Sequence, residues 1–447
     1  MTALEPLNAL NASADSQEET SECFARATEV LKAQDGLRKL VFTAPTSPDA
    51  DGAIIIDGKP YIDFSSNDSL GLAHHPALMH AAVAATQSEG TSSASSRLIL
   101  GSSTRIRSLE TTVARWQKTE AALVFNSGYQ LNCCLPSALA QPGDVFFMDK
   151  ACHASLVDGV ILACAKTREV TFKRFQHQDF AHLARLLAQT PVKGQRWIVT
   201  ESLFSMGGDV TRLPDLCTLA AQFQGRIILD EAHAVGLYGG SQNRFSGFAN
   251  TVPNPLRGTI ALVIGTFGKA LGSQGAFVAA PQELIDWLVQ SARGFVYSTA
   301  LPPGVIAASQ AALELVLTSD ALQNRLFNVI DSFNAALSAS ENLGASAASE
   351  SCGLVLPKIG ATRSHIVPVM CGSNTAALMA QAVLQAKGLW VHAIRPPTVK
   401  PGQAMLRISL SARHAPEQVQ ALVSGLQGVL VNSKLTKWAN CYESVSF

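Results

Sequence analysis

Several features that mark particular protein classes are scarce in this 447-residue sequence. Aromatic residues make up 6% of it, while glycine and alanine are plentiful, which suits an α/β enzyme better than a sandwich or barrel of short strands. The 34 Lys and Arg residues balance 34 Asp and Glu residues, so the composition does not indicate a nucleic-acid-binding protein. No apolar run reaches the roughly 18 residues that a membrane-spanning helix needs, so stable membrane insertion is not expected. With 47% hydrophobic and 15% charged residues, the chain can instead bury a large core.

Signs of disulfides, metal sites and targeting segments are also missing. The nine cysteines are odd in number and no pair has the Cys-x-x-Cys spacing, so buried free thiols are expected rather than a disulfide framework or a zinc site. The amino terminus lacks the apolar segment of a signal peptide, and its acidic residues Asp15, Glu18, Glu19 and Glu22 disfavour a mitochondrial transit peptide. We therefore expect a cytoplasmic protein without a bound metal.

Composition and periodicity divide the chain into four parts. The expected divisions are a mobile leader at residues 1–20, a helix and hairpin segment at 21–80, a large α/β domain at 81–315 and a small α+β domain at 316–447. The hairpin is expected at 53–64, where the turn Asp57-Gly58 separates two apolar runs. A long helical stretch is expected after Leu301-Pro302-Pro303 to about residue 337, and a Ser-, Ala- and Glu-rich joint is expected at 338–351.

Strand and helix patterns alternate through the central part. The expected strands are 121–125, 145–149, 170–175, 196–201, 226–230, 261–265 and 275–279, and the expected helices are 107–117, 129–139, 155–165, 180–189, 213–223 and 282–292. In the last part we expect strands at 365–369 and 405–410 and helices at 375–387 and 416–431. Alternation at this spacing predicts a mostly parallel sheet with helices on both faces, which binds ligands at the carboxyl ends of its strands.

Two charged residues follow such strand ends. Lys269 comes after an apolar strand and a Gly-rich turn, where partial burial can lower the pKa of an amine and allow a Schiff base, although a surface lysine has the same pattern. A Walker A loop is excluded, because Val263 and Ala270 stand where that motif needs Gly and Ser or Thr. Asp230 ends another strand, where a carboxylate can hold a pyridine nitrogen protonated, and His233 follows three residues later. Both residues of that pair could also be simple capping residues.

Two further segments supply polar groups at the same edge. The turn at 126–129 stands between a strand and a helix, and the free N–H groups of a helix N-terminus bind phosphate. His153 follows the strand at 145–149. Each signal is weak alone, since many such turns and histidines are structural. Together they offer a phosphate cradle, an imidazole that can stack on a ring, an acid for a ring nitrogen and an amine, which is the set that pyridoxal phosphate requires.

The motifs identify the chain as similar to the α-oxoamine synthases, a family of fold-type I pyridoxal-phosphate transferases. The matching segments are 64–72 (FSSNDSLGL), 126–129 (NSGY), 152–156 (CHASL), 204–206 (FSM), 230–233 (DEAH), 266–269 (TFGK) and 297–303 (YSTALPP). The resemblance runs from about Arg38 to the carboxyl terminus. It implies an α/β fold with a large mostly parallel sheet domain and a smaller carboxyl-terminal α+β domain.

The resemblance also implies residue roles. Lys269 would carry the cofactor and then act as a general base, with Asp230 at the ring nitrogen and His153 stacked on the ring. The remaining cofactor contacts implied are Ser205 and His233 on the phenolate side, Gly128, Tyr129 and Thr266 at the phosphate, and Ser298 or Thr299 from a second subunit of a homodimer. The substrate contacts implied are Asn67, Arg407 or Arg395 for the amino-acid carboxylate, and Arg38 at the acyl entrance.

Two segments, 393–399 (AIRPPTV) and 406–411 (LRISLS), look most like the biotin-pathway branch of this family. That branch condenses L-alanine with a pimeloyl thioester, carried by CoA or a carrier protein, with loss of CO2. The loop at 101–106 departs from the family, with Ile106 where relatives usually have His, and Gly207 replaces a usual Asp. The altered loop leaves open an enzyme of the serine palmitoyltransferase or autoinducer-synthase type that uses another acyl-CoA, or glycine or serine in place of alanine.

Overall fold

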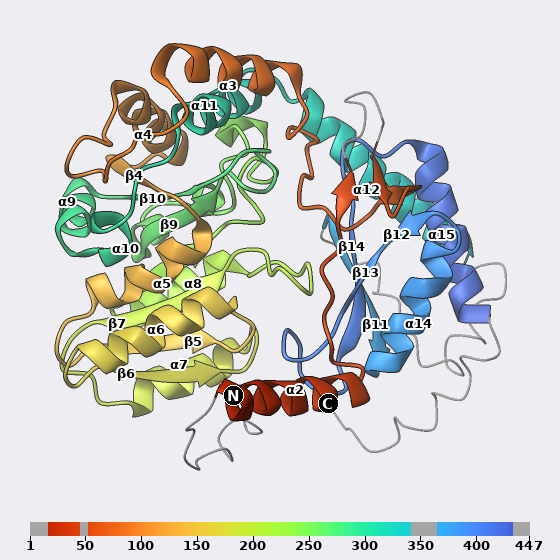
Figure 1. Cartoon of the computed structure of the whole chain (residues 1–447). Coiled ribbons are helices and arrows are strands. Elements are labelled where there is room, and N and C mark those ends of the chain that lie inside the picture. The colour runs from red at the N-terminus through yellow and green to blue at the C-terminus, as the bar shows by residue number, and fades with distance from the viewer. Residues whose placement is uncertain (1–16, 45–51, 341–363, 432–447) are drawn as a thin grey trace. The chain divides into compact units, whose positions relative to one another are not determined.

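A computed structural model describes residues 17–44, 52–340 and 364–431 (Figure 1). The chain forms two compact units. Unit 1 combines Met1–Ser66 with Phe327–Phe447, and unit 2 is the continuous stretch Asn67–Leu326. Residues 1–16 of the leader expected at 1–20, the larger part of the joint at 338–351, and Cys352 and Cys441 lie outside the described residues. Residues 17–20 of that leader are helical, as the start of α2 (Gln17–Ala33). The four functional divisions expected from the sequence remain a prediction.

Unit 2 is organised around a seven-stranded sheet. Its strands, in spatial order, are β4 (Ala121–Phe125), β10 (Ala276–Ala280), β9 (Ile260–Thr266), β8 (Gly225–Asp230), β7 (Arg196–Glu201), β5 (Val145–Asp149) and β6 (Thr171–Phe175). β10 is antiparallel to its neighbours β4 and β9. The other neighbouring pairs, β9–β8, β8–β7, β7–β5 and β5–β6, are parallel. The expected strands are thus present within one or two residues, and the prediction of a mostly parallel sheet is confirmed.

Helices cover both faces of this sheet (Figure 1). The helices of unit 2 are α3 (Pro76–Glu89), α4 (Thr104–Gln117), α5 (Gly128–Leu139), α6 (Ala154–Lys166), α7 (Phe180–Gln189), α8 (Leu213–Gln222), α9 (Gln282–Ser291), α10 (Arg293–Val296) and α11 (Pro303–Thr318). One core joins α5, α6 and α9 to the face that contains Phe146, and a second joins α7 and α8 to the face that contains Phe147. Because both faces are buried, the central strands are apolar nearly throughout and become polar where they end.

Helix α3 was not predicted, although its ends carry recognisable signals. His75 caps it by accepting a hydrogen bond from the Ala77 N–H (3.2 Å), Pro76 is its first residue, and Gly90 ends it with a positive φ of 89°. Its alanine-rich interior gives no apolar periodicity, which is why the pattern alone did not indicate a helix.

The described residues of unit 1 form two small sheets and three complete helices. Strands β1 (Thr43–Ala44), β2 (Ala53–Ile56), β3 (Lys59–Asp63) and β12 (Leu389–Trp390) form one sheet, and β11 (Ile366–Gly372), β14 (Ala404–Ser409) and β13 (His392–Ile394) form an antiparallel one. Its complete helices are α2 (Gln17–Ala33), α14 (Asn374–Gln385) and α15 (Pro416–Val431). The β2–β3 hairpin is confirmed, with positive φ at Asp57 and Gly58 in its turn.

The long helical stretch expected after residue 303 is present, but a bend divides it. The structure has two helices, α11 and α12 (Ala321–Ser340), with a bend of 76° between them. Ser319 takes an extended conformation that ends α11, and its Oγ accepts a hydrogen bond from the Ala321 N–H (3.2 Å) at the start of α12. Among residues 17–44, 52–340 and 364–431, no single helix is long and apolar enough to cross a membrane, although this bent pair passes that length and composition test together.

Candidate active site

The ends of β8 and β9 bring Lys269 beside His233. Strand β9 ends at Thr266, and Lys269 follows three residues later. Lys269 begins a turn in which the Gly272 N–H donates to the Lys269 carbonyl (2.9 Å). Its Nζ lies 2.8 Å from Nε2 of His233, which follows β8. At this distance the two groups share one proton, so a protonated imidazole facing an ammonium is excluded. The amine therefore has a partner that can take up or return a proton.

Asp230 is a buried carboxylate at the end of β8. Its Oδ2 accepts a hydrogen bond from Nδ2 of Asn132 on α5 (2.8 Å), and its Oδ1 accepts one from the Ala232 N–H (2.9 Å). The same Asn132 amide lies 3.0 Å from Oγ of Ser155, and its own Oδ1 is buried with no hydrogen bond. These contacts fix the direction of the Asp230 carboxylate. The sequence analysis missed Asn132, because an asparagine inside a predicted helix carries no positional signal.

Glu201, at the end of β7, is the second buried carboxylate of the site. It is directly opposite Asp230 in the sheet register, and its Oε1 accepts a hydrogen bond from the His153 N–H (2.6 Å). Burial and the charge of Asp230 raise the pKa of Glu201 to about 8, while Lys269 acts in the opposite direction. The sequence analysis missed this residue too. The signal was present, since β5, β7 and β8 each end in a carboxylate.

The N-terminus of α5 is the place where a phosphate cradle is predicted. The Ser127 Oγ caps the helix by accepting from the Gln130 N–H (3.2 Å), and a side chain added at Gly128 would meet nothing within 4 Å. Tyr129 is 52% exposed, with its ring edge-on to His153 at a centroid distance of 6.4 Å. Its hydroxyl donates to Asp158, a hydrogen bond that raises the pKa of Tyr129 to about 12. The open side of this helix end and its N–H groups suit an anion.

Three other predicted cofactor contacts are Thr266, Ser298 and Thr299. Thr266 ends β9, with its hydroxyl donating to the Gly275 carbonyl (2.8 Å) and accepting from the Gly268 N–H (3.1 Å). Within this chain Ser298 Oγ accepts a hydrogen bond from Nε2 of Gln130 (2.5 Å), and the Thr299 carbonyl accepts one from Nδ2 of Asn126 (2.7 Å). The structure therefore places Ser298 and Thr299 beside the α5 turn of their own chain, and a contribution to a second subunit remains a prediction.

Ser205 and Asn67 come from two loops of unit 2. Ser205 is 8% exposed and follows Phe204 in the loop after β7. Asn67 is exposed, and its carbonyl accepts a hydrogen bond from the Ser69 N–H (2.8 Å). A side chain at Gly272 would lie 2.4 Å from the Ala73 nitrogen, so the segment that follows Asn67 packs against the turn of Lys269. The structure thus places Leu72 and Ala73 against the turn that follows Lys269, and a role of Asn67 at the substrate remains a prediction.

The three predicted substrate arginines belong to unit 1. The Arg38 guanidinium donates to Oγ1 of Thr398 (3.0 Å), and Arg395 donates to the backbone carbonyls of Asp35 and of Leu37 (the latter at 3.2 Å). The 35–38 and 395–398 segments are therefore held together. Arg407 lies on β14, 7% exposed, where burial lowers its pKa to about 10. Its NH1 donates to Oγ of Ser409 (2.8 Å).

The groups gathered in unit 2 fit pyridoxal phosphate. They comprise an amine (Lys269), a buried carboxylate fixed in direction (Asp230), two imidazoles (His153 and His233) and an open helix N-terminus at Gly128. This donor set matches the aldehyde, ring nitrogen, ring face and phosphate of that cofactor. In the part of the chain that the structure describes, no group of three or more His, Cys, Asp or Glu side chains is arranged to hold a metal ion.

The sequence of the chain is also similar to a known family and to curated proteins. Residues 59–426 match the family described as aminotransferase class I and II. An 8-amino-7-oxononanoate synthase of Gluconacetobacter diazotrophicus is 42% identical, covering 85% of this chain and 91% of the relative. Another, from Geobacter metallireducens, is 38% identical and covers 90% of this chain and 97% of the relative.

Solved structures share the fold. A structure of SPT with a PLP internal aldimine has a TM-score of 0.80 at 25% identity, covering 93% of this chain and 98% of that one. The 8-amino-7-oxononanoate synthase of Francisella tularensis has a TM-score of 0.66 at 26% identity, covering 84% of this chain and 98% of that one. The predicted resemblance and fold class are confirmed by these similarities.

Proposed function

The chain belongs to the class I and II aminotransferase family, and we infer that it catalyses the synthesis of 8-amino-7-oxononanoate, the reaction for which its curated relatives are named. It condenses L-alanine with a pimeloyl thioester and releases CO2 and the free thiol, a step of biotin biosynthesis. The observation that carries this conclusion is the pairing of Lys269 with His233 beside the fixed carboxylate of Asp230, on a chain 38–42% identical to those synthases.

Pyridoxal phosphate, when bound, supplies the electron sink that makes the Cα proton of alanine removable. We assign its phosphate to the N–H groups of Gly128 and Tyr129 and to Thr266, and its ring nitrogen to Asp230. The Asn132 amide keeps the Asp230 carboxylate in one orientation, which a stable ion pair with a ring N–H requires. His153 is assigned to the ring face, and Ser205 and His233 to the phenolate side.

Lys269 is the group we assign to the proton transfers. A general base must reach the proton it removes and must be able to return it, and Lys269 Nζ already shares a proton with Nε2 of His233. His233 can therefore take up a proton from the amine or return one to it when Lys269 acts as a base. Glu201 lies beside Asp230 in the sheet register, and its carboxylate accepts hydrogen bonds from the backbone of His153 and of Ser205, so it holds the backbone at two of the assigned ring contacts.

The substrate contacts are assigned to arginines of unit 1 and to Asn67. Arg407 is proposed for the alanine carboxylate, because a buried guanidinium provides a bidentate donor pair for a carboxylate. Arg38 is proposed for the terminal carboxylate of the pimeloyl chain. Arg395 is a weaker candidate for either, since its guanidinium holds the carbonyls of Asp35 and Leu37. A homodimer, in which Ser298 or Thr299 reaches the neighbouring site, and a cytoplasmic location complete the proposal.

A related condensation with another acyl donor is the second candidate. It is favoured by one observation, the higher TM-score with SPT (0.80) than with the Francisella tularensis synthase (0.66). Steady-state rates with pimeloyl, palmitoyl and acetyl thioesters, each with alanine, glycine and serine, separate the two. A clear preference for pimeloyl thioester and alanine supports the first function. Equal or better rates with palmitoyl-CoA and serine would replace it with the second.

A further inference from the structure

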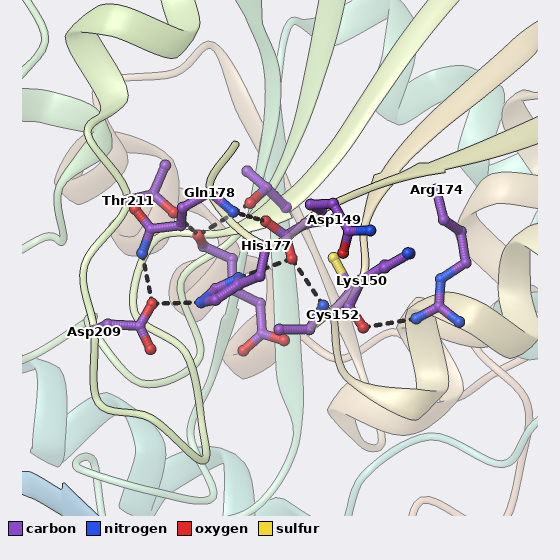
Figure 2. Close-up of polar contacts among 12 residues, drawn as sticks. Asp149, Lys150, Cys152, Arg174, His177, Gln178, Asp209 and Thr211 are labelled. Atoms are coloured by element: carbon purple, nitrogen blue, oxygen red, sulfur yellow. Dashed lines mark hydrogen bonds and ion pairs between the residues drawn. The ribbon is translucent and has the colours of Figure 1, made fainter. Parts of the chain in front are cut away.

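His177 connects two loops of unit 2 at the carboxyl edge of the sheet (Figure 2). Its Nδ1 lies 2.9 Å from Oδ1 of Asp149, the last residue of β5, and its Nε2 lies 2.8 Å from Oδ2 of Asp209, in the loop after β7. The neighbouring Gln178 follows the same pattern, with its backbone N–H donating to Asp149 (2.9 Å) and its side-chain amide donating to Asp209. One short segment after β6 therefore joins the end of β5 to the loop that follows β7.

Both ring nitrogens of His177 face carboxylate oxygens, so both must carry a hydrogen. A neutral imidazole has one N–H, and it would leave one carboxylate facing a lone pair. The geometry therefore requires the imidazolium. Burial alone would lower the pKa of His177, but the hydrogen bonds and charges of Asp149 and Asp209 outweigh it and raise the pKa to about 10. His177 is then a fixed cation throughout the neutral pH range.

On one side His177 holds the turn that carries Ser205. The Phe204 N–H donates to the Asp209 carbonyl (3.0 Å), so these two residues close a turn over 205–208. His177 contacts both stems of that turn: its Nε2 binds the Asp209 carboxylate, and its ring lies edge-on to Phe204 at a centroid distance of 4.4 Å. Ser205 is the first residue inside the turn, so its position depends on these two stems.

On the other side His177 holds the loop that carries His153. The Asp149 Oδ1 that faces His177 also accepts a hydrogen bond from the Ala151 N–H (2.7 Å). The Asp149 carbonyl accepts one from the Cys152 N–H (3.2 Å), and His153 follows directly as the N-cap of α6. The direction of the Asp149 carboxylate thus sets the path of the backbone into His153.

We propose that His177 is a positioning residue, whose imidazolium bridges Asp149 and Asp209 and thereby fixes His153 and Ser205 relative to each other at the cofactor ring. The proposal rests on the function inferred above, because it assigns both residues to the ring. It adds a residue that touches neither cofactor nor substrate. A cofactor ring that contacts both the His153 imidazole and the Ser205 hydroxyl requires a constant distance between these two groups. A single cation that binds both loops keeps that distance constant.

Gly207 makes this arrangement possible. A Cβ at residue 207 would lie 2.1 Å from Oδ1 of Asp209, a distance that no real contact reaches. A side chain there would displace the Asp209 carboxylate and remove its hydrogen bond with His177. The substitution Gly207→Ala therefore tests the bridge without changing either charged partner.

The first experiment compares amide hydrogen exchange in the cofactor-free wild type and in His177→Gln, with His80→Gln as the matched control on the exposed surface of α3. The bridge predicts roughly tenfold faster exchange confined to residues 149–153 and 202–211 in His177→Gln, and no change in the control. Unchanged exchange in both segments would overturn the proposal. Faster exchange across the whole of unit 2 would also overturn it, because it would indicate a general loss of stability.

The second experiment uses the cofactor-loaded enzymes. We expect kcat to fall about tenfold in His177→Gln and in Gly207→Ala, with the KM values for alanine and thioester nearly unchanged, and the visible circular dichroism of the bound cofactor to weaken. The double variant should be no worse than either single one, since both remove the same contact. A change in KM with full kcat, or additive losses, would contradict the bridge. If the wild type makes no amino ketone, the proposed function fails, while the exchange experiment still decides the role of His177.

Discussion

The Nζ atom of Lys269 lies 2.8 Å from Nε2 of His233. A lysine that donates to a neutral imidazole in this way has a proton acceptor in place before any ligand arrives. We expect Lys269→Ala to lower kcat by about 10² to 10⁴-fold, the range for removal of a general base, and to abolish covalent attachment of the cofactor. Turnover and mass spectrometry after borohydride treatment measure the two effects. The exposed Lys193→Ala is the control, and a variant of Lys269 that retained covalent cofactor would refute the assignment.

Asn132 provides a test of how Asp230 is oriented. Substitution by Leu, which has a similar volume, removes the 2.8 Å hydrogen bond to Asp230 and leaves that buried oxygen with one donor fewer. We expect the free energy of unfolding to fall by about 1–3 kcal/mol and kcat to fall about tenfold. Urea unfolding and steady-state kinetics measure them, with the exposed Asn324→Leu as control. Full activity with lowered stability would restrict Asn132 to a structural role.

Glu201 gives the cofactor-free protein a pH-dependent stability. Its pKa is raised from 4.5 to about 8 by burial and by Asp230, so the folded state retains a proton that the unfolded chain releases. The resulting stability is complete below pH about 4.5 and is lost as the pH rises through about 8, with the folding constant falling up to about tenfold per pH unit. Glu201→Gln should remove this dependence of the folding constant on pH, apart from the part due to Glu231, whose pKa is raised to about 7. Denaturant unfolding between pH 5 and 9 tests this, and equal slopes in the two proteins would contradict it.

Arg407 is tested by the substrate it is expected to bind. Lysine keeps the charge but loses the planar pair of donors, so Arg407→Lys should raise the KM for alanine about tenfold and leave the KM for the thioester unchanged. Arg395→Lys is the comparison, since its guanidinium holds backbone carbonyls of 35 and 37. A larger effect of Arg395→Lys than of Arg407→Lys on the alanine KM would reverse the two assignments.

Much of this architecture can be read from the sequence, for physical reasons that differ between elements. The central strands were predicted within one or two residues because both their faces are buried, which makes each an apolar run with a polar end. Lys269, Asp230, His153 and the α5 turn were found because they follow such ends. Asn132 was missed because it acts from inside a helix, and His177 because its role depends on Asp149 and Asp209, which lie 28 and 32 residues away. The bend at Ser319 was missed because flanking apolar patterns continued across it.

Arg38 links the proposed acyl specificity to the charges of unit 1. Its guanidinium donates a hydrogen bond to Thr398. Burial of the His392 ring and the positive charges of Arg395 and Arg38 lower the pKa of His392. A site with this excess of positive charge favours an acyl chain that ends in a carboxylate over one that ends in a methyl group. Arg38→Gln should therefore raise the KM for the pimeloyl thioester about tenfold while leaving that for an uncharged acyl thioester of equal length unchanged. Rates with the two donors in both proteins measure this preference. An equal loss for both donors would mean that Arg38 only holds the 395–398 segment in place, and the carboxylate would then need another partner.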